Sequence, residues 1–210
     1  MVRWHRPYDT GRMPMELDDL DPDPIVELGR WLQAAEAADV PLPNAFALAT
    51  VDAHGSPSVR FVLLHALAAD GLRYFTNRSS RKGRDVAQNP RAAAAFWWSQ
   101  LDRQARVAGR VEPLDHAASL AYWRTRPRGS QLSAAASEQG AQVASREELE
   151  AAVRRLERRH PADIPLPDTW GGYLLVPDRV ELWTSRPDRL HDRIEYVRKA
   201  DAWRRRRLQP

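Results

Sequence analysis

Residues 45–64, AFALATVDAHGSPSVRFVLL, decide the fold. The stretch holds two apolar runs, residues 45–51 and 58–64, of the length and composition that strands have. Asp52-Ala53-His54-Gly55 separates them, and Gly55 can take the positive φ that a tight turn requires. The stretch therefore predicts a β-hairpin.

Three further segments extend this hairpin into a sheet. Residues 72–76 follow Asp70-Gly71, and residues 92–98 and 104–112 come after them, the last with apolar and polar residues in alternation. Five short strands in close succession are typical of an antiparallel barrel.

Helix-start signals surround the predicted sheet. Asp23 can cap a helix that begins at Pro24, and Ser145 to Glu148 form a capping box. Shorter helices are expected after Ser80 and after Asp115, the first ended by Asn89-Pro90 and the second broken at Pro127-Arg128-Gly129. Final strands are predicted at residues 172–176, 180–183 and 194–198, followed by a basic tail. The fold class is α+β, an antiparallel barrel with peripheral helices; residues 1–20 form an N-terminal arm and residues 21–210 a single domain.

Composition excludes several kinds of site. The 210 residues include no cysteine, which removes disulfides, thiolate metal sites and cysteine nucleophiles. The six histidines have no metal-binding spacing, so no metal site is expected, and no P-loop or GxGxxG motif is present. Any redox chemistry must come from a bound cofactor. No apolar run could cross a membrane, and no secretory signal opens the chain, which predicts a cytoplasmic protein.

Arginine carries almost all of the positive charge. Lysine and arginine total 32 against 28 acidic residues, a formal net charge of +4, yet only Lys82 and Lys199 are lysines. Arginine suits bidentate binding of phosphates and carboxylates. Two functional interpretations are open, a nucleic-acid surface or discrete anion pockets. A genome whose base composition favours arginine codons is the alternative explanation of the total count.

Ser79-Ser80-Arg81-Lys82 lies where a strand is expected to meet a helix. Free N–H groups, hydroxyls and two cations then converge on the positive end of the helix, which favours an anion. An ordinary serine cap followed by solvated cations is the alternative.

Arg189, His191 and Arg193 alternate, so in an extended segment all three side chains point the same way. Two guanidiniums beside an imidazole lower its pKa and favour an anionic, planar ligand. A solvated loop is the alternative.

Tyr122, Arg126 and Ser130 straddle the end of one predicted helix and the loop after it. A phenol, a guanidinium and a hydroxyl in this order could close on a phosphate. The spacing alone is a weak signal.

Several separated motifs together resemble the FMN-dependent pyridoxamine 5'-phosphate oxidase family, from about Tyr8 to the last residue. They are Arg60-Phe61-Val62-Leu63-Leu64, Phe75-Thr76-Asn77 with Ser80-Arg81-Lys82, Arg103-Gln104, Arg126-Pro127-Arg128-Gly129-Ser130-Gln131, Trp170-Gly171-Gly172, Glu181-Leu182-Trp183, Arg189-Leu190-His191-Asp192-Arg193 and Arg207-Leu208-Gln209-Pro210.

The resemblance implies an FMN-binding split β-barrel, a homodimer with FMN at the subunit interface and a C-terminal dimerisation region. It implies that the flavin phosphate is held by Arg60, Arg81 and Lys82. It also assigns a substrate phosphate to Tyr122, Arg126 and Ser130, with His65 beside them, and catalytic contacts over the substrate ring to Arg189 and His191. The remaining flavin contacts that it implies are Phe61, Val62, Leu63, Phe75, Thr76, Gln104, Gln139, Trp183 and Arg193.

The activity that this resemblance implies is oxidation of pyridoxamine or pyridoxine 5'-phosphate to pyridoxal 5'-phosphate. Hydride moves from the substrate's C4' carbon to the flavin, and dioxygen then accepts the electrons and becomes hydrogen peroxide. The expected partners are a small phosphorylated pyridine and dioxygen, with no nucleic acid and no membrane.

Three departures from the family pattern fall on the substrate side. His65 stands where the family has a lysine, Ala135 where it usually has a tryptophan, and Gly140 where it usually has a serine. A related oxidase of a larger aromatic intermediate, as in phenazine biosynthesis, is therefore the alternative enzyme. A third interpretation is a non-catalytic module that binds nucleic acid through Arg204-Arg205-Arg206-Arg207.

Overall fold

The structure is a computed structural model that describes residues 14–210. Most of the predicted arm lies outside the described residues, and so do the N-terminal residues on which the absence of a secretory signal was predicted.

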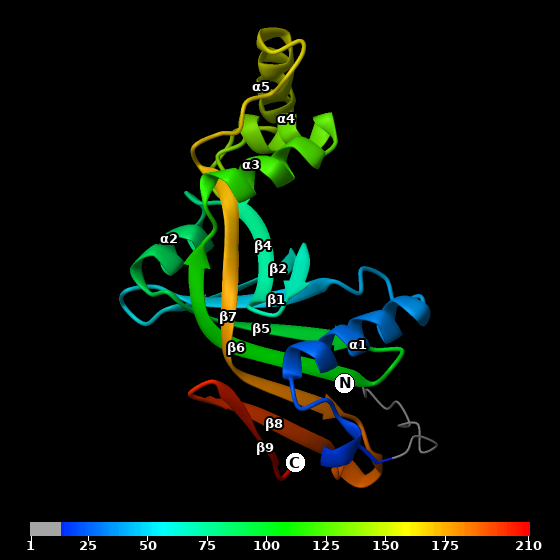
Figure 1. Ribbon diagram of the computed structural model, residues 1–210. Coiled ribbons are helices and arrows are strands. Elements are labelled where there is room, and N and C mark those ends of the chain that lie inside the picture. Colours follow the sequence, from blue (N-terminus) through cyan, green and yellow to red (C-terminus); the bar gives the residue numbers. More distant parts are fainter. Residues whose placement is uncertain (1–13) are drawn as a thin grey trace, which may run out of the picture.

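One nine-stranded sheet forms the body of the described chain, in the order β2-β1-β5-β6-β7-β4-β3, with β8 paired to β7 and β9 to β8 (Figure 1). Every pairing is antiparallel. The strands are β1 (Ala45–Val51), β2 (Pro57–Leu63), β3 (Ala66–Ala68), β4 (Gly71–Asn77), β5 (Arg91–Trp98), β6 (Arg103–Pro113), β7 (Trp170–Thr184), β8 (Asp192–Lys199) and β9 (Ala202–Arg207).

The predicted hairpin is the first pair of this sheet. Ala45 lies opposite Leu63 and Val51 opposite Pro57, and the turn places Gly55 at a φ of 84°. The next three predicted strands are β4, β5 and β6, each longer than predicted by one or two residues at its ends. The antiparallel arrangement expected from residues 45–112 is therefore confirmed.

Helices lie around the sheet, and α1, α2, α3 and α5 begin where the sequence predicts. Asp23, Ser80, Asp115 and Ser145 each cap a helix by accepting a backbone N–H through the side chain. Helices α3, α4 and α5 gather beyond one end of β7, while β8 and β9 lie at its other end (Figure 1). The helices are α1 (Pro24–Ala37), α2 (Arg81–Gln88), α3 (His116–Thr125), α4 (Arg128–Ala136) and α5 (Arg146–Arg159), with short 3-10 turns at Leu17–Asp19 and Pro187–Arg189.

Strand β7 replaces two predicted strands. The sequence suggests a break at Pro177, because proline donates no ladder hydrogen bond. In the structure the strand continues, since the register with β6 shifts between Ala108 and Gly109 so that Gly109 lies opposite Pro177 and Asp178 bulges out. A bulge tolerates proline, so the prediction of two separate strands is wrong.

Three other segments differ from the sequence prediction. The basic tail is strand β9, which forms a hairpin with β8. A further helix, α4, begins directly after Pro127, where the sequence predicted a loop. The three-residue strand β3 was not predicted. In each case tertiary contacts stabilise a segment whose own pattern is too short or too polar to be recognised.

Two apolar cores support these elements. The larger lies between the sheet and α1 and includes Phe96, whose ring contacts those of Phe46 and Trp98. The smaller lies under α3, α4 and α5 around Trp123 and Trp170, whose ring centroids are 4.9 Å apart. The second core fixes the helical cap onto the start of β7.

The N-terminal segment that the structure describes packs against the sheet. Met15 and Leu20 are buried in the larger core, and the Met15 N–H donates to the Asp192 carboxylate at 3.1 Å. The boundary at residue 20 between an arm and a single domain stays a prediction.

Replacement of Gly109 by alanine should destabilise the protein strongly. A Cβ at Gly109 would lie 1.9 Å from the carbonyl oxygen of Val176, so β6 and β7 would have to separate at the bulge. We expect the free energy of unfolding, measured by urea denaturation, to fall by about 3 kcal/mol. Gly129→Ala is the matched control, because a Cβ there meets nothing within 4 Å; equal midpoints for both variants would contradict this role of Gly109.

Candidate active site

A cleft of about 1110 Å³ opens between β2, β4, the start of α2 and the helical cap. Most of the predicted site residues line it, although they come from segments far apart in the sequence. Those of the flavin group are Arg60, Phe61, Val62, Leu63, Phe75, Thr76, Arg81, Lys82 and Gln139, and those of the substrate group are His65, Tyr122, Arg126 and Ser130.

The cleft is electropositive. Four cations line it, Arg60, Arg81, Lys82 and Arg126, and none of the described lining residues is an aspartate or glutamate. Clefts lined by charge of one sign raise the local potential for the opposite charge. The arrangement suits a ligand that carries more than one negative charge.

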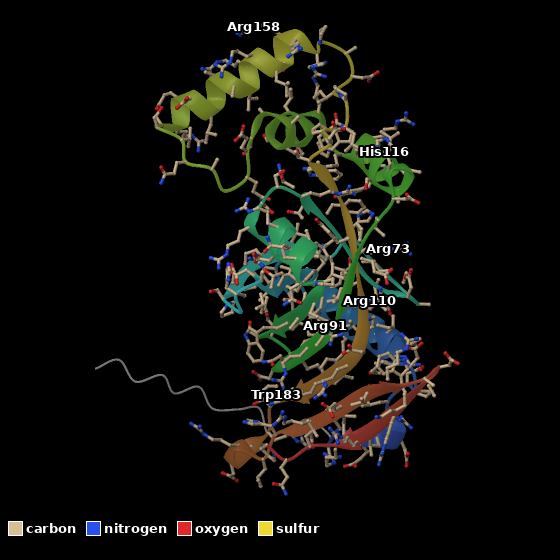
Figure 2. The ribbon with its side chains drawn as sticks, turned by 90° about the vertical axis from the view of Figure 1, so that its left-hand side faces the viewer. Arg73, Arg91, Arg110, His116, Arg158 and Trp183 are labelled. Atoms are coloured by element: carbon tan, nitrogen blue, oxygen red, sulfur yellow. The ribbon has the colours of Figure 1, made fainter. Side chains whose placement is uncertain are left out.

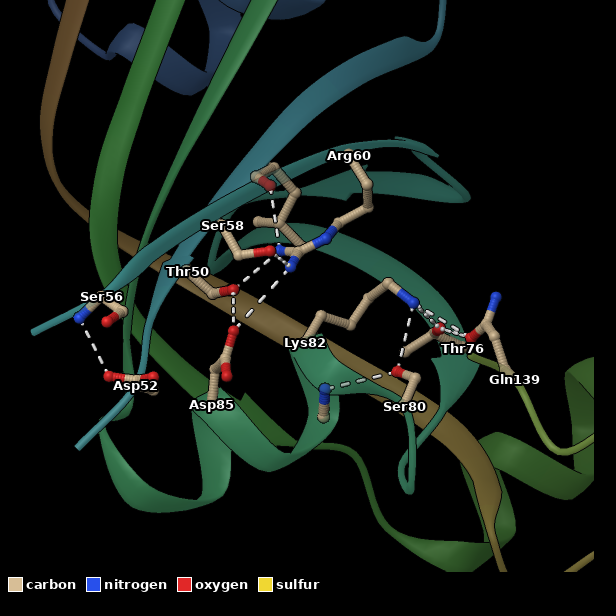
Figure 3. A network of polar contacts seen from close by, with 12 residues as sticks. Thr50, Asp52, Ser56, Ser58, Arg60, Thr76, Ser80, Lys82, Asp85 and Gln139 are labelled. Carbon is tan, nitrogen blue, oxygen red and sulfur yellow. Dashed lines mark hydrogen bonds and ion pairs between the residues drawn. The ribbon is translucent and has the colours of Figure 1, made fainter. Parts of the chain in front are cut away.

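Lys82 is the most enclosed of these cations (Figure 3). Its Nζ donates to Thr76 Oγ1 at 3.0 Å, Ser80 Oγ at 3.2 Å and Gln139 Oε1 at 3.0 Å, all of them neutral oxygens. Burial, together with the nearby Arg60 guanidinium, lowers the pKa of Lys82 to about 8. Ser80 does cap α2, but Lys82 is buried and not solvated, which favours the anion-site interpretation of this motif.

Arg60 points from β2 toward the same region and is held by a built network (Figure 3). Its Nη1 donates to Thr50 Oγ1 at 2.7 Å and its Nη2 to Ser58 Oγ at 2.7 Å. Asp85 Oδ2 lies 3.8 Å away and accepts from Thr50 Oγ1 at 2.6 Å. Burial lowers the pKa of Arg60, with Asp85 acting in the opposite direction. The network fixes the guanidinium through two hydroxyl acceptors and one longer ion pair, with Asp85.

The other end of the cleft is an aromatic stack. The ring centroid of Tyr122 lies 3.9 Å from His65, 4.3 Å from Phe75 and 5.9 Å from Trp170. The Arg126 guanidinium lies over Trp170 at 4.7 Å, a cation–π contact. The stack forms a flat apolar wall with a cation at one end.

Arg126 has hydrogen-bonding capacity to spare. Its Nη2 donates to the Ser130 carbonyl at 3.2 Å, whereas its buried Nη1 has no partner within the described protein. Burial lowers the pKa of Arg126. Ser130 lies in the first turn of α4 and not in the predicted loop, and it still lines the cleft beside Arg126. Because Nη1 is enclosed by protein atoms, a ligand acceptor could satisfy it only after the Arg126 side chain turns toward the cleft.

His65 separates the cleft from a second cavity of about 490 Å³, which we call the back pocket. His65, Phe75 and Tyr122 line both cavities. Burial and the guanidinium of Arg73 lower the pKa of His65. The rest of the back-pocket lining is Ala66, Arg73, Leu114, Asp115, Ala118, Ala121 and Thr125.

Five predicted site residues do not line the cleft, and we call them the distal set: Gln104, Trp183, Arg189, His191 and Arg193. Gln104 lies opposite Trp183 across β6 and β7, and Trp183 lies opposite Arg193 across β7 and β8. Figure 2 shows Trp183 low on the sheet and His116, at the start of α3, at the opposite end. The structure therefore brings the predicted residues together in two groups.

The distal set has its own geometry. The His191 ring lies 4.6 Å from Trp183, and its Nδ1 accepts from the Arg186 N–H at 3.1 Å. Burial first, and then the guanidiniums of Arg189 and Arg193, lower the pKa of His191, the predicted direction. Arg189 does not share an extended segment with His191, because it ends a 3-10 turn with a φ of 63°. The prediction of three side chains alternating on one face is wrong.

Some residues of the site have no signal in the sequence. Thr50 and Asp85 hold Arg60, but no spacing in the chain relates them to it. The motif Trp170-Gly171-Gly172 does not indicate that Trp170 lies between Tyr122 and Arg126. These contacts depend on how the strands pair in the sheet, and the spacing of residues along the sequence does not predict that pairing.

Three arginines of β9 bind residues of the same chain. Arg206 pairs with Glu195 at 2.6 Å, Arg207 with Asp192 at 2.7 Å, and Arg205 donates to backbone carbonyls of the N-terminal segment. The run therefore offers less free charge to a polyanion than its sequence suggests. Among residues 14–210 no group of His, Asp and Glu is arranged to hold a metal ion, and no helix is both long and apolar enough to span a membrane.

Two family models match the chain. The model described as pyridoxamine 5'-phosphate oxidase matches residues 32–160, and the one described as the pyridoxine 5'-phosphate oxidase C-terminal dimerisation region matches residues 170–210. The pyridoxine/pyridoxamine 5'-phosphate oxidase of Anaeromyxobacter dehalogenans is 53% identical over 190 residues, which cover 90% of this chain and 96% of that protein. The enzyme of the same name from Thermosynechococcus vestitus is 45% identical, with 96% of each chain covered.

Solved structures agree on the fold. PhzG from Burkholderia lata, in complex with tetrahydrophenazine-1-carboxylic acid, superposes with a TM-score of 0.90 at 31% identity, covering 96% of this chain and 99% of that one. A pyridoxamine 5'-phosphate oxidase-related, FMN binding protein from Nostoc punctiforme gives a TM-score of 0.71 at 22% identity, covering 87% and 95%. The predicted split-barrel class is confirmed. With one family model over residues 32–160, another over 170–210 and relatives that match nearly end to end, this chain belongs to the pyridoxamine 5'-phosphate oxidase family.

Proposed function

We propose that this protein is an FMN-dependent oxidase that converts pyridoxamine or pyridoxine 5'-phosphate to pyridoxal 5'-phosphate, with dioxygen as electron acceptor. The observation that carries the proposal is the cleft itself, which has cations at both ends, an aromatic wall and no carboxylate among its described lining residues. Two phosphorylated aromatic molecules match this pattern of charge. The names of the relatives support the same activity, and the cytoplasmic location expected from the sequence is part of the proposal.

The flavin phosphate is assigned to Arg60, Arg81 and Lys82. Lys82 donates only to neutral oxygens, and its burial disfavours the positive charge on its ammonium group. A bound anion would supply the negative charge that stabilises this ammonium group. The start of α2 adds the positive end of a helix. When bound, FMN supplies the redox step by accepting a hydride from the substrate and passing both electrons to dioxygen, with hydrogen peroxide as product.

The substrate is assigned to the aromatic end. The unpaired Arg126 Nη1, the Tyr122 hydroxyl and Ser130 would bind its phosphate. Phe75, Tyr122 and Trp170 provide flat faces on which a pyridine ring can stack. A phosphate held at one end and a ring held on a wall fix the position of the carbon that is oxidised.

The distal set requires a second copy of the chain. Trp170, in the cleft, and Trp183, in the distal set, lie on one strand and are 13 residues apart, a span of about 40 Å when a strand is extended. One chain therefore cannot close its own cleft with its own distal set. We assign each cleft a distal set from a partner in a homodimer.

An apolar edge and the family match support the homodimer. Val59, Phe61 and Leu63 project from β2 with exposed fractions of 68%, 77% and 53%, and Trp97 on β5 is 52% exposed. Phe61 and Leu63 also line the cleft. Apolar surface at the mouth of a site is typical of an interface that encloses it. In that arrangement Arg189 and His191 of the partner would lie over the substrate ring, the imidazole in its neutral form.

A larger aromatic substrate is the second candidate. The relative that supports it is PhzG, whose structure holds tetrahydrophenazine-1-carboxylic acid. Gly140 lines the cleft, where it adds no side chain to its wall, whereas Ala135 packs beside the smaller core. The unpaired Arg126 Nη1 favours the phosphorylated substrate, because a ligand without an anion would leave it buried and unsatisfied.

Lys82→Met should weaken FMN binding. The substitution removes the buried cation and its charge-assisted hydrogen bonds, which we expect to raise the Kd for FMN by roughly 10- to 100-fold. Flavin fluorescence titration of the apoprotein measures this. Lys199→Met is the matched control, because Lys199 is the other lysine and lies exposed at the end of β8. The same loss in both variants would contradict the assignment of Lys82.

Anaerobic mixing with pyridoxamine or pyridoxine 5'-phosphate should bleach the flavin absorbance of the wild-type holoenzyme. Arg126→Met should lower kcat/KM for these substrates by about 100-fold, because it removes the phosphate's main cation. Arg124→Met, on the exposed side of the same helix end, is the control. Persistent flavin colour with both phosphorylated vitamers, and bleaching by an unphosphorylated polycyclic aromatic acid, would favour the second candidate.

Mixed dimers should recover activity from two inactive variants. At an FMN concentration that fills only the wild-type site, Lys82→Met leaves the cleft of its own chain empty, and His191→Ala disables the distal set that its chain lends to the partner. In a heterodimer of the two, one site combines both defects and the other has neither. We therefore expect refolding from a mixture to restore up to about half of the wild-type activity per heterodimer. No recovery in heterodimers isolated by two different affinity tags would contradict a shared site.

A further inference from the structure

His65 occupies a partition at the substrate end of the cleft. Its ring packs on Tyr122 at 3.9 Å and on Phe75 at 5.0 Å, so two aromatic side chains hold it in place. It also lines both the cleft and the back pocket. The imidazole can therefore reach a ligand in the cleft from a fixed position.

The groups that face His65 keep its ring neutral. On β4, Arg73 lies on the back-pocket side, and on α3, Tyr122 covers the ring. Asp115 lines the same back pocket, but its carboxylate accepts the Ala118 N–H at 2.7 Å and caps α3. Across the aromatic stack stands a second cation, Arg126. His65 is an exposed residue, and its partial desolvation and the guanidinium of Arg73 lower its pKa from the ordinary value, which favours the uncharged imidazole in the site without a ligand.

A doubly charged ligand reverses this balance. A negative charge within about 4–6 Å raises the pKa of a histidine by roughly 1–3 units. Binding of a dianion and protonation of His65 are then thermodynamically linked.

We propose that His65 is the specificity-determining residue of the substrate end, which takes up a proton when a dianionic ligand binds and so makes selection for the phosphate dependent on pH. The inference deepens the proposed function and rests on it. A permanent cation at this position would attract phosphate at every pH, whereas His65 becomes positively charged only when a dianionic ligand binds. An uncharged aromatic ligand would gain stacking alone and cause no proton uptake.

The sign of the pH effect follows from the linkage. Above the pKa of His65 in the complex, the ring is neutral in both states and contributes no charge to binding. As the pH falls toward its pKa in the free protein, the complex is protonated first, and the affinity rises by up to about tenfold per unit of pKa difference. The gain lies between the two pKa values and is complete below that of the free protein.

The test is proton uptake on ligand binding to the FMN-loaded protein. The probe is 4-deoxypyridoxine 5'-phosphate, which lacks the oxidisable C4' substituent. Calorimetric titrations at one pH near 7, in buffers of different ionisation enthalpy, count the protons bound. We expect uptake by the wild type that exceeds that of His65→Gln, and an affinity about tenfold lower in the variant at about pH 6.5, converging at about pH 8.5. His116→Gln is the matched control, because His116 is an exposed histidine at the start of α3 outside both cavities (Figure 2).

Each outcome decides the question. Proton uptake that is equal in wild type and His65→Gln overturns the inference, since the proton then goes to the phosphate or to His191. His65→Lys should bind the probe tightly at pH 8.5 and lose the wild-type dependence on pH. Bound FMN in every variant reports an intact fold. If the wild type fails to bind the probe and is not reduced by either phosphorylated vitamer, the proposed function fails, which is distinguishable from binding without a contribution of His65.

Discussion

Continuity of β7 is the constraint on which the rest of the molecule depends. The strand pairs with β4, β6 and β8, and its two ends carry Trp170 and Trp183. It continues past Pro177 only because Gly109 lets the carbonyl of Val176 approach at the bulge. The same strand that joins the helical cap to the C-terminal hairpin therefore separates the cleft from the distal set. The length of one strand is therefore the physical basis of the proposal that a second chain completes the site.

Much of the fold was predictable because its signals are local. Alternation, turn residues and caps act within a few residues, and they placed the first hairpin, β4 to β6 and the starts of four helices. The errors arose where a distant segment decides the structure. No residue near Pro177 in the sequence indicates that Gly109 lies opposite it on the facing strand. The arginines of β9 have the composition of a basic tail, because their acidic partners, such as Glu195 and Asp192, lie on β8.

The sequence predicted which residues form the site better than it predicted how they are arranged. The family resemblance selected residues that do line one cleft, and the helix-start argument independently selected Lys82. Neither gave the division into two groups, because the resemblance lists residues without saying which chain supplies them. Alternation of Arg189, His191 and Arg193 failed as an argument because it presumed an extended backbone, whereas the 3-10 turn rotates Arg189 away from that pattern.

The cations of this arginine-rich chain differ in their partners between the sheet surface and the cleft. Arginine on the sheet surface pairs with carboxylates, as Arg206 does with Glu195 at 2.6 Å. In the cleft, Lys82 has only neutral partners, and Arg60 has one longer ion pair, with Asp85 at 3.8 Å. Such burial costs free energy in the empty protein and is relieved when an anion binds. Ligand binding and stability are then two measures of one interaction, since a ligand at 100 times its Kd stabilises the folded state by about 2.7 kcal/mol. The cleft is therefore a less stable part of the fold for the same reason that it is selective for anions, and a neutral His65 keeps that cost lower than a further permanent cation would.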